Sequence, residues 1–397
     1  MSRRVVKKRR TERNLSKGKP DKFVLYFAIF MAIFGAIMIF DASVYQATAV
    51  FNDQFHFLKL QVIWLLLGSI PALLIYFWDY KKLIKISTLL LIVTIFLLIA
   101  VLIFGEKING AKRWLSIGPV DIQPAEFLKI ILTIFLSGWL SKTDTTQKNI
   151  KGTFDKIINS KSTKLLVILG TITSLIVLQP DLGTAVIICI TSFIMFLMAS
   201  EDRKHTLSSI GIILLVIPVG ILAAILEPYR LKRIQTFLTL LLTGDVADAQ
   251  GSGYQMQQIL IGIGSGGFLG KGFGQSRQRF GYLVENTAFT DSTFAIILEE
   301  LGLVGGVVLI LGWLFFLWRG LKIATNTQDK QGKLLASGIT IWLVLQALMN
   351  MAANVGLMPL TGLPSPFISY GGSNTLVTLI GIAILLNISR YNTNNGQ

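Results

Sequence analysis

A carboxylate stands close in sequence to several cations in the segment between residues 271 and 291. Lys271, Arg277 and Arg279 supply positive charge, and Asp291 follows them after a polar stretch. A carboxylate can take a proton from a hydroxyl group, and cations beside it can stabilise an anionic leaving group. The segment therefore suits general-base activation of a hydroxyl group, while a solvated polar loop is the plainer alternative that composition leaves open.

A glycine-rich run precedes these residues, from Gly262 to Gly274. Its first part, Gly262-x-Gly264-x-x-Gly267, formally matches a dinucleotide-binding pattern. We reject that interpretation because no strand precedes the run and no βαβ unit surrounds it. Glycine lets the backbone approach a ligand closely or turn sharply at the membrane interface, and we expect one of these two roles.

Two further groups of cations flank apolar segments of the chain. Arg113 stands beside Trp114, and Arg230 and Arg233 stand within the segment 229–233. A cation beside an interfacial tryptophan is common in membrane proteins by itself. Arginine also binds phosphate through two parallel hydrogen bonds, so Arg113 equally suits a lipid-linked phosphate.

Glu126 and Lys129 lie inside an apolar segment whose helix is expected to begin near Pro124. Residues three apart share one face of a helix, so the two side chains can pair. An ionisable residue inside a membrane span is functional by default, although a pair can also be purely structural. We favour a structural ion pair and keep a direct substrate role as the alternative.

Three other acidic residues have structural interpretations. Asp181 lies in the turn Gln179-Pro180-Asp181 and suits the N-cap of the following helix. Glu299 and Glu300 open an apolar segment, where the helix dipole favours negative charge. Adjacent residues point in different directions on a helix, so the spacing of these two glutamates does not by itself predict a paired-carboxylate site.

The elements that position these residues are predicted to be membrane-spanning helices. The chain of 397 residues is 52% hydrophobic and 15% charged, with a mean hydropathy of +0.64, whereas a soluble domain carries about 25% charged residues. Apolar runs of about 20 residues cross a bilayer as helices and lack the alternation of barrel strands. The fold class is therefore an all-α polytopic membrane protein with ten transmembrane helices. The expected spans are residues 23–41, 57–77, 83–104, 122–141, 164–179, 183–199, 206–226, 293–318, 333–355 and 371–389.

Two connections stand out between these spans. Residues 227–292, between the seventh and eighth spans, form a segment too long for a passive connector. Its apolar part, residues 234–242, favours an amphipathic helix in the membrane interface. Residues 356–370 contain prolines and glycines and are nearly uncharged, so we expect a re-entrant segment that lines a cavity.

The distribution of basic residues predicts the orientation. One side of the predicted spans holds 26 of the 37 Lys and Arg residues, and basic short loops face the cytoplasm. Both termini are therefore expected in the cytoplasm, and residues 227–292 outside. Residues 1–22 form a basic tail that is attracted to anionic lipid, 23–389 the membrane domain and 390–397 a second tail.

The same composition excludes several other classes. Because the net charge of +16 comes largely from the tail and short loops, we expect no nucleic-acid partner. The single cysteine, Cys189, excludes an intrachain disulfide framework and a cysteine-based zinc site. The two histidines, His56 and His205, lie far apart in sequence, so a histidine metal cluster is not expected.

Eight motifs that occur in order resemble the SEDS family, the FtsW, RodA and SpoVE polytopic proteins of bacterial cell-wall synthesis. The resemblance covers nearly the whole chain after the N-terminal tail. The motifs are Gly110-Ala-Lys-Arg-Trp114, Gln123-Pro-Ala-Glu126 with Lys129, Gln179-Pro-Asp-Leu-Gly-Thr184, Tyr229-Arg230 with Arg233, Gly251-Ser-Gly-Tyr-Gln255, Gly264-Ser-Gly-Gly267 through Gly274-Gln-Ser-Arg-Gln278, Asp291 ahead of Glu299-Glu300-Leu-Gly302, and Pro364-Ser-Pro-Phe-Ile-Ser-Tyr-Gly-Gly372.

The resemblance implies a peptidoglycan glycosyltransferase that polymerises lipid II at the outer face of the bacterial cytoplasmic membrane. It implies a class B penicillin-binding protein as partner, together with other divisome or elongasome membrane proteins. The family's catalytic aspartate matches Asp291. Residues 272–278 resemble the FtsW, or division, branch more closely than the RodA, or elongation, branch, which stays as the alternative.

The chain departs from the family pattern close to Asp291. Val284 stands where the family usually has proline, and Phe289 and Thr290 place Asp291 two residues later than usual. These departures change the expected shape of the loop and its contacts with the acceptor. They do not remove the aspartate.

The reaction that the resemblance implies is an inverting glycosyl transfer. Asp291 takes the proton from the GlcNAc 4-hydroxyl of one lipid II, that oxygen attacks the MurNAc anomeric carbon of the growing strand, and undecaprenyl pyrophosphate leaves. Mg²⁺ or Mn²⁺, held partly by Asp291 and the pyrophosphate, is an expected cofactor whose protein ligands stay open, and no organic cofactor is expected. The residues expected to bind substrate are Arg113, Trp114, Arg230, Arg233, Lys271, Ser276, Arg277, Gln278 and Arg279.

Two other classes of function stay open. A transporter or lipid flippase also carries charges and broken helices within the membrane, although the two halves of this chain show no inverted repeat. A scaffold that recruits a synthase through its spans is the third class. A flippase moves its substrate unchanged, an enzyme lengthens glycan, and a scaffold alone does neither.

Overall fold

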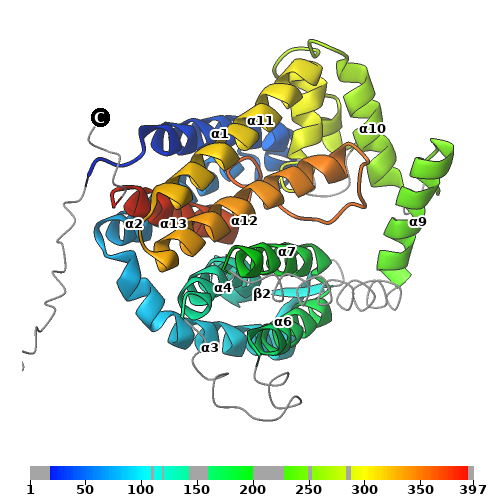
Figure 1. Ribbon diagram of the computed structural model, residues 1–397. Helices are drawn as coiled ribbons and strands as arrows, with labels where there is room; N and C mark the ends of the chain where they lie inside the picture. Colours follow the sequence, from blue (N-terminus) through cyan, green and yellow to red (C-terminus); the bar gives the residue numbers. More distant parts are fainter. Residues whose placement is uncertain are drawn as a thin grey trace, which may run out of the picture.

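A computed structural model shows a bundle of helices, with a few short strands on one side (Figure 1). The structure describes residues 18–108, 111–118, 120–142, 160–199, 228–248, 253–282 and 288–391. Within these residues, eight helices are long and apolar enough to cross a membrane. They are α1 (Lys22–Phe51), α2 (His56–Phe77), α3 (Tyr80–Phe104), α6 (Lys161–Leu178), α7 (Leu182–Ala199), α11 (Thr293–Asn326), α12 (Lys330–Asn354) and α13 (Gly372–Ser389).

A ninth helix, α4 (Pro124–Leu140), corresponds to the fourth predicted span and has 17 residues. It begins at Pro124, as expected from the preference of proline for the first turn. The seventh predicted span, residues 206–226, lies outside the described residues. The long segment that follows it contains α9 (Pro228–Thr243), α10 (Tyr254–Gly266) and a π-helical turn, η2 (Gln278–Tyr282).

The first and eighth spans are longer than predicted. α1 continues past Asp41 to Phe51, and α11 continues past residue 318 to Asn326. Asp41 is only 2% exposed, and its carboxylate pairs with Arg279. The prediction that the span ends at this charge was wrong, because a buried ion pair lets the helix carry a carboxylate into the bundle.

α12 and α13 form the centre of the bundle, and α2 lies at its periphery. Over the most apolar stretch of each helix, 83% of α12 and 78% of α13 are buried, compared with 17% of α2. α12 packs against α4, α7, α11 and α13. Peripheral side chains such as Leu66 and Leu74 of α2 are 64% and 66% exposed, which a chain in lipid tolerates.

A small antiparallel sheet, which the sequence did not predict, joins α3 to α4. Strands β1 (Glu106–Ile108), β2 (Ala111–Ile117) and β3 (Val120–Ile122) pair in the order β1-β2-β3. Two of the strands have three residues each. Such short strands fall below the length at which an alternating pattern can be recognised.

The connection between α12 and α13 enters the bundle without helical structure. Leu363 and Phe367 are buried, and a Cβ on Gly35 of α1 would lie 2.0 Å from the Phe367 carbonyl oxygen. Gln346 Nε2 donates to the Pro364 carbonyl at 2.8 Å. The predicted re-entrant segment is therefore present, but at these residues close protein packing covers it where a cavity was expected.

The two ends of the described chain lie together. The Gly18 N–H donates to the Arg390 carbonyl at 2.8 Å, and the Asp21 N–H donates to Ser389 Oγ at 2.9 Å. α9 and α10 lie at the opposite end of the bundle, on the right in Figure 1. The outer segment and the chain ends therefore occupy opposite ends of the molecule.

Candidate functional site

Asp291 lies in the short connection that leads into α11, directly before the N-cap residue Ser292. Its backbone carbonyl accepts hydrogen bonds from Asn350 Nδ2 at 2.8 Å and from Asn354 Nδ2 at 2.9 Å. Both asparagines belong to α12 and are 2% and 1% exposed. The central helix of the bundle thus fixes the backbone that carries this carboxylate.

The carboxylate of Asp291 is half-buried beside a cation of α9. Burial raises the pKa of Asp291 above its ordinary range, while the nearby Arg233 guanidinium and a hydrogen bond from Thr290 act in the lowering direction. The Thr290 hydroxyl lies 3.0 Å from Asp291 Oδ1. A raised pKa makes the carboxylate a stronger base, which suits proton transfer from a hydroxyl group.

The connection between α12 and α13 completes this site. Arg233 Nη1 donates to the Leu360 carbonyl at 2.6 Å. A Cβ on Gly362 would lie 4.0 Å from both Arg233 Nη1 and Asp291 Oδ2, and Gly362 has a φ of +67°, which disfavours a side chain. Three segments that are far apart in sequence therefore meet around one carboxylate and one guanidinium.

A divalent ion at Asp291 would find few protein ligands. Within the part of the chain that the structure describes, no three His, Cys, Asp or Glu side chains gather as a metal site. Mg²⁺ is often held by one or two carboxylates plus substrate phosphates and water. The residues present fit that arrangement only with Asp291 as a single carboxylate ligand, and the expected Mg²⁺ or Mn²⁺ stays a prediction.

Four of the predicted substrate-binding residues gather around Glu299, further along α11. Glu299 accepts hydrogen bonds from Lys271 Nζ at 2.8 Å and from Ser276 Oγ at 2.6 Å. The backbone N–H groups of Arg277 and Gln278 donate to it at 3.2 and 3.4 Å. These residues therefore bind a carboxylate of the protein, and their contact with substrate stays a prediction.

Glu299 and Glu300 do not lie where the helix-dipole interpretation placed them. α11 begins at Thr293 and has no acidic residue in its first turn. The two glutamates are 1% and 0% exposed, and the Ser276 N–H donates to Glu300 at 3.0 Å. Their carboxylates hold the loop of residues 271–279 against α11, so the dipole interpretation was wrong.

The glycine-rich run packs against a break in α11. Gly302 has a φ of +67° and interrupts the helix. After the break, the N–H groups of Leu303 and Val304 donate to carbonyls of the loop at 3.0 and 3.2 Å. A Cβ on Gly270 would lie 2.1 Å from the Glu300 carbonyl oxygen. The close approach that glycine permits is here an approach to helix backbone.

The two arginines of the same loop differ in their surroundings. The Arg279 guanidinium pairs with Asp41 of α1 and lies 4.9 Å from the ring centre of Phe280. Arg277 is exposed. The loop of residues 271–279 therefore uses Arg279 to hold α1 and presents Arg277 at the surface.

The remaining predicted substrate-binding residues lie on β2 and α9. Arg113 Nε donates to the Gln179 carbonyl at 3.3 Å, and its Nη2 contacts the Pro180 carbonyl, so Arg113 binds the turn between α6 and α7. Trp114 lies on β2, where it pairs with β1. The side chain of Arg230 lies outside the part of the chain that the structure describes.

Two structural predictions agree with the geometry. Asp181 accepts hydrogen bonds from the Thr184 N–H at 3.2 Å and hydroxyl at 2.9 Å, which caps the start of α7. Glu126 and Lys129 form a buried ion pair of 2.8 Å. Lys129 also donates to Gln346 Oε1 at 2.7 Å, so the pair joins a network between α4 and α12.

The sequence analysis missed three polar residues of α12. Gln346, Asn350 and Asn354 are buried, and each binds backbone of another segment or of its neighbour. Asn350 Nδ2 also donates to the Leu363 carbonyl at 2.7 Å. These residues recur at every fourth position within an apolar span, and that polar stripe is the signal that identifies them.

Comparison with known proteins gives matches along nearly the whole chain. The model of the family FTSW_RODA_SPOVE, described as cell cycle protein, matches residues 21–394. Stage V sporulation protein E of Bacillus subtilis is 37% identical over 377 residues, covering 94% of this chain and 98% of that protein. A probable peptidoglycan glycosyltransferase FtsW of Legionella pneumophila is 36% identical over 390 residues, covering 95% and 94%.

Solved structures give the same result for the fold. A chain from a structure described as the structural coordination of polymerization and crosslinking by a peptidoglycan synthase complex superposes with a TM-score of 0.72 at 25% identity, covering 94% of this chain and 98% of that one. The rod shape determining protein RodA of Thermus thermophilus superposes with a TM-score of 0.64 at 23% identity, with the same coverage. The chain therefore belongs to the FTSW_RODA_SPOVE family of cell cycle proteins, the SEDS family that its motifs resemble.

Proposed function

We propose that this protein is a peptidoglycan glycosyltransferase that polymerises lipid II at the outer face of the bacterial cytoplasmic membrane. Relatives that match more than nine-tenths of the chain are named as probable peptidoglycan glycosyltransferases. The observation that carries the proposal is the placement of Asp291. Its half-buried carboxylate is fixed by α12 and lies beside Arg233 of the outer segment.

Asp291 is the general base of this reaction. It takes the proton from the GlcNAc 4-hydroxyl of one lipid II, and that oxygen forms a bond to the MurNAc anomeric carbon of the lipid-linked strand. The bond from this carbon to the pyrophosphate oxygen breaks, and undecaprenyl pyrophosphate leaves with the electron pair. Attack opposite the leaving group inverts the configuration at the anomeric carbon.

Arg233 is the cation best supported for stabilising the leaving pyrophosphate. It lies near Asp291, so both groups can face one reacting centre. Lys271 and Arg279 are engaged in ion pairs with carboxylates of the protein. A divalent ion bound through Asp291 and the pyrophosphate would supply further positive charge to the leaving group.

The assembly and the division role follow from the relatives. The similarity to a chain of a peptidoglycan synthase complex supports a cross-linking partner, for which we propose a class B penicillin-binding protein. Relatives named FtsW support a role in cell division, with elongation as the alternative. The described chain ends lie together, away from α9 and α10, which supports two cytoplasmic termini.

The test is glycan polymerisation from labelled lipid II by the full chain with its cognate penicillin-binding protein and Mg²⁺ or Mn²⁺. Wild type is compared with Asp291→Asn and with Asp53→Asn, a control at an exposed acid that pairs with Lys59. We expect polymer from wild type and the control and none from Asp291→Asn, with unchanged melting temperatures.

Two results would contradict this proposal. Polymer from purified Asp291→Asn would mean that another group is the base. Absence of polymer from every variant, together with movement of intact lipid II across liposomes, would support a flippase.

A further inference from the structure

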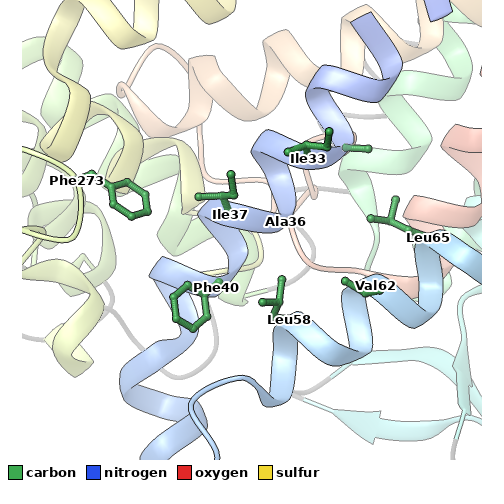
Figure 2. A pocket seen from close by; sticks show the side chains of 9 residues that line it. Ile33, Ala36, Ile37, Phe40, Leu58, Val62, Leu65 and Phe273 are labelled. Carbon is green, nitrogen blue, oxygen red and sulfur yellow. The ribbon is translucent and has the colours of Figure 1, made fainter. Parts of the chain in front are cut away.

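An apolar groove lies on the outside of the bundle between α1 and α2 (Figure 2). Its volume is about 520 Å³, which lies within the range of small-molecule sites. One face of α1 between Ala32 and Phe40, one face of α2 between Leu58 and Leu65, and Phe273 line it. Every side chain in the lining is apolar, so the groove suits a hydrocarbon chain.

The shape of the groove follows from the residues of α1. Ala32 and Ala36 are one helical turn apart and leave a depression, because alanine fills little space beside its larger neighbours. Gly35, on another face of α1, holds the helix against the Phe367 backbone. The wall residues Ile33 and Ile37 are 59% and 46% exposed. The groove therefore opens sideways, where the surrounding lipid has direct access.

The outer end of the groove is close to the connection that carries Asp291. Phe57 immediately precedes the groove residue Leu58 on α2. The Phe57 ring packs against Phe289 with a centroid distance of 4.3 Å, and Phe289 stands two positions before Asp291. One layer of aromatic side chains thus joins the groove to the proposed catalytic site.

Cations surround the same end of the groove. Phe273 belongs to the loop of residues 271–279, in which Arg277 is exposed and the Lys271 side chain is 28% exposed. Asp41 directly follows the groove residue Phe40 and pairs with Arg279 of that loop. An amphiphile with its chain in the groove would place its anionic head beside these positive charges.

We infer that this groove binds the polyprenyl chain of the lipid-linked substrate, with the phosphates turned toward the loop of residues 271–279. The inference rests on the proposed function and names the part of the protein that holds the membrane anchor of the substrate. A polyprenyl chain buries apolar surface against both helices. The aromatic layer then separates this chain from the sugar-reacting centre at Asp291.

The test is photolabelling in nanodiscs with a polyprenyl pyrophosphate that carries a diazirine on its chain. The full-length Asp291→Asn protein is used, so that binding is measured without turnover. We expect labelled peptides from residues 32–40 and 58–65, and unlabelled undecaprenyl phosphate is expected to displace the probe. Equal displacement by phosphatidylglycerol would reveal an ordinary annular lipid position and overturn the inference, as would labelling confined to other helices.

Variants that fill the groove make the test quantitative. Ala36→Trp and Val62→Trp are each expected to weaken probe binding about tenfold, the effect of displacing one or two buried methylene groups. Val62 is 42% exposed, so its replacement fits without overpacking. Ala100→Trp is the matched control, because Ala100 is half-buried on α3 and does not line the groove. Loss of binding in all three folded variants would overturn the inference.

Kinetics separates this inference from the proposed function. In an otherwise wild-type chain, Ala36→Trp is expected to raise the KM for lipid II about tenfold with kcat nearly unchanged, since only uniform binding is lost. A chain that polymerises lipid II but is not labelled in the groove would overturn the groove alone. A labelled groove in a chain without polymerase activity would support the groove and contradict the proposed function.

Discussion

Two buried carboxylates near the start of α11 have opposite surroundings. Glu299 is 1% exposed and accepts hydrogen bonds from five donors: Ser265, Lys271, Ser276, Arg277 and Gln278. Asp291 is half-buried, and its strongest anchors, Asn350 and Asn354, bind its backbone carbonyl and leave the carboxylate to other partners.

This difference distinguishes a carboxylate that holds structure from one that is arranged for chemistry. The donors around Glu299 occupy its acceptor sites and lower the pKa-independent need for solvent, so it stays charged within the protein. At Asp291 the backbone is fixed while the side chain keeps access to a neighbouring guanidinium and to Gly362. Rigid support of the backbone with an accessible side chain is what precise positioning requires.

The largest expected effect is on catalysis by Asp291→Asn. Removing the general base should lower the polymerisation rate by about 10²- to 10⁴-fold, while the melting temperature of the purified protein stays close to that of wild type. Single-turnover polymerisation from labelled lipid II measures the rate. A residual rate within tenfold of wild type would contradict the comparison.

Glu299→Gln should instead act on stability. Removing the charge leaves Lys271 without its partner and breaks a buried network, which we expect to destabilise the protein by about 3 kcal/mol. Thermal unfolding in detergent measures the change, and Glu106→Gln, at an exposed position of β1, should change stability by less than about 0.5 kcal/mol. A stable but inactive Glu299→Gln would place this carboxylate in the chemistry.

Asn350→Ala and Asn354→Ala should impair the positioning of Asp291. Each removes a donor to the Asp291 carbonyl, so we expect kcat to fall about tenfold while KM changes little. The matched control is Asn387→Ala, since this buried asparagine also donates to two carbonyls, those of Tyr76 and Trp78, near the opposite end of the bundle. Equal losses of kcat in the control would indicate a general loss of structure.

The smallest expected effect is a shift in pH dependence. kcat/KM should rise with pH through the pKa of Asp291, above the ordinary aspartate value of about 4, because the base acts when deprotonated. Arg233→Gln removes a charge that lowers this pKa, so the rise should move to higher pH. Since the folded-state pKa is raised, the contribution of Asp291 to stability falls as pH increases through the same range. An unshifted profile would show that Arg233 does not act on Asp291.

Features that depend on neighbours in sequence were predicted well. The i, i+3 spacing of Glu126 and Lys129 predicted their ion pair, and the turn at Asp181 predicted a helix cap. Both follow from helix geometry and need little information about the rest of the fold. By contrast, the extension of α1 past Asp41 depends on Arg279, a partner far away in sequence, and was not predicted.

The sequence by itself determined the apolar spans, the family and the choice of Asp291, because hydrophobic runs and ordered motifs are properties of the chain alone. Only the tertiary structure decided the surroundings of each charged residue. It placed Lys271 and Ser276 on Glu299, and Arg233 beside Asp291. The physical reason is that hydrogen bonding and burial depend on which distant segments pack together, and a spacing within one segment does not encode that packing.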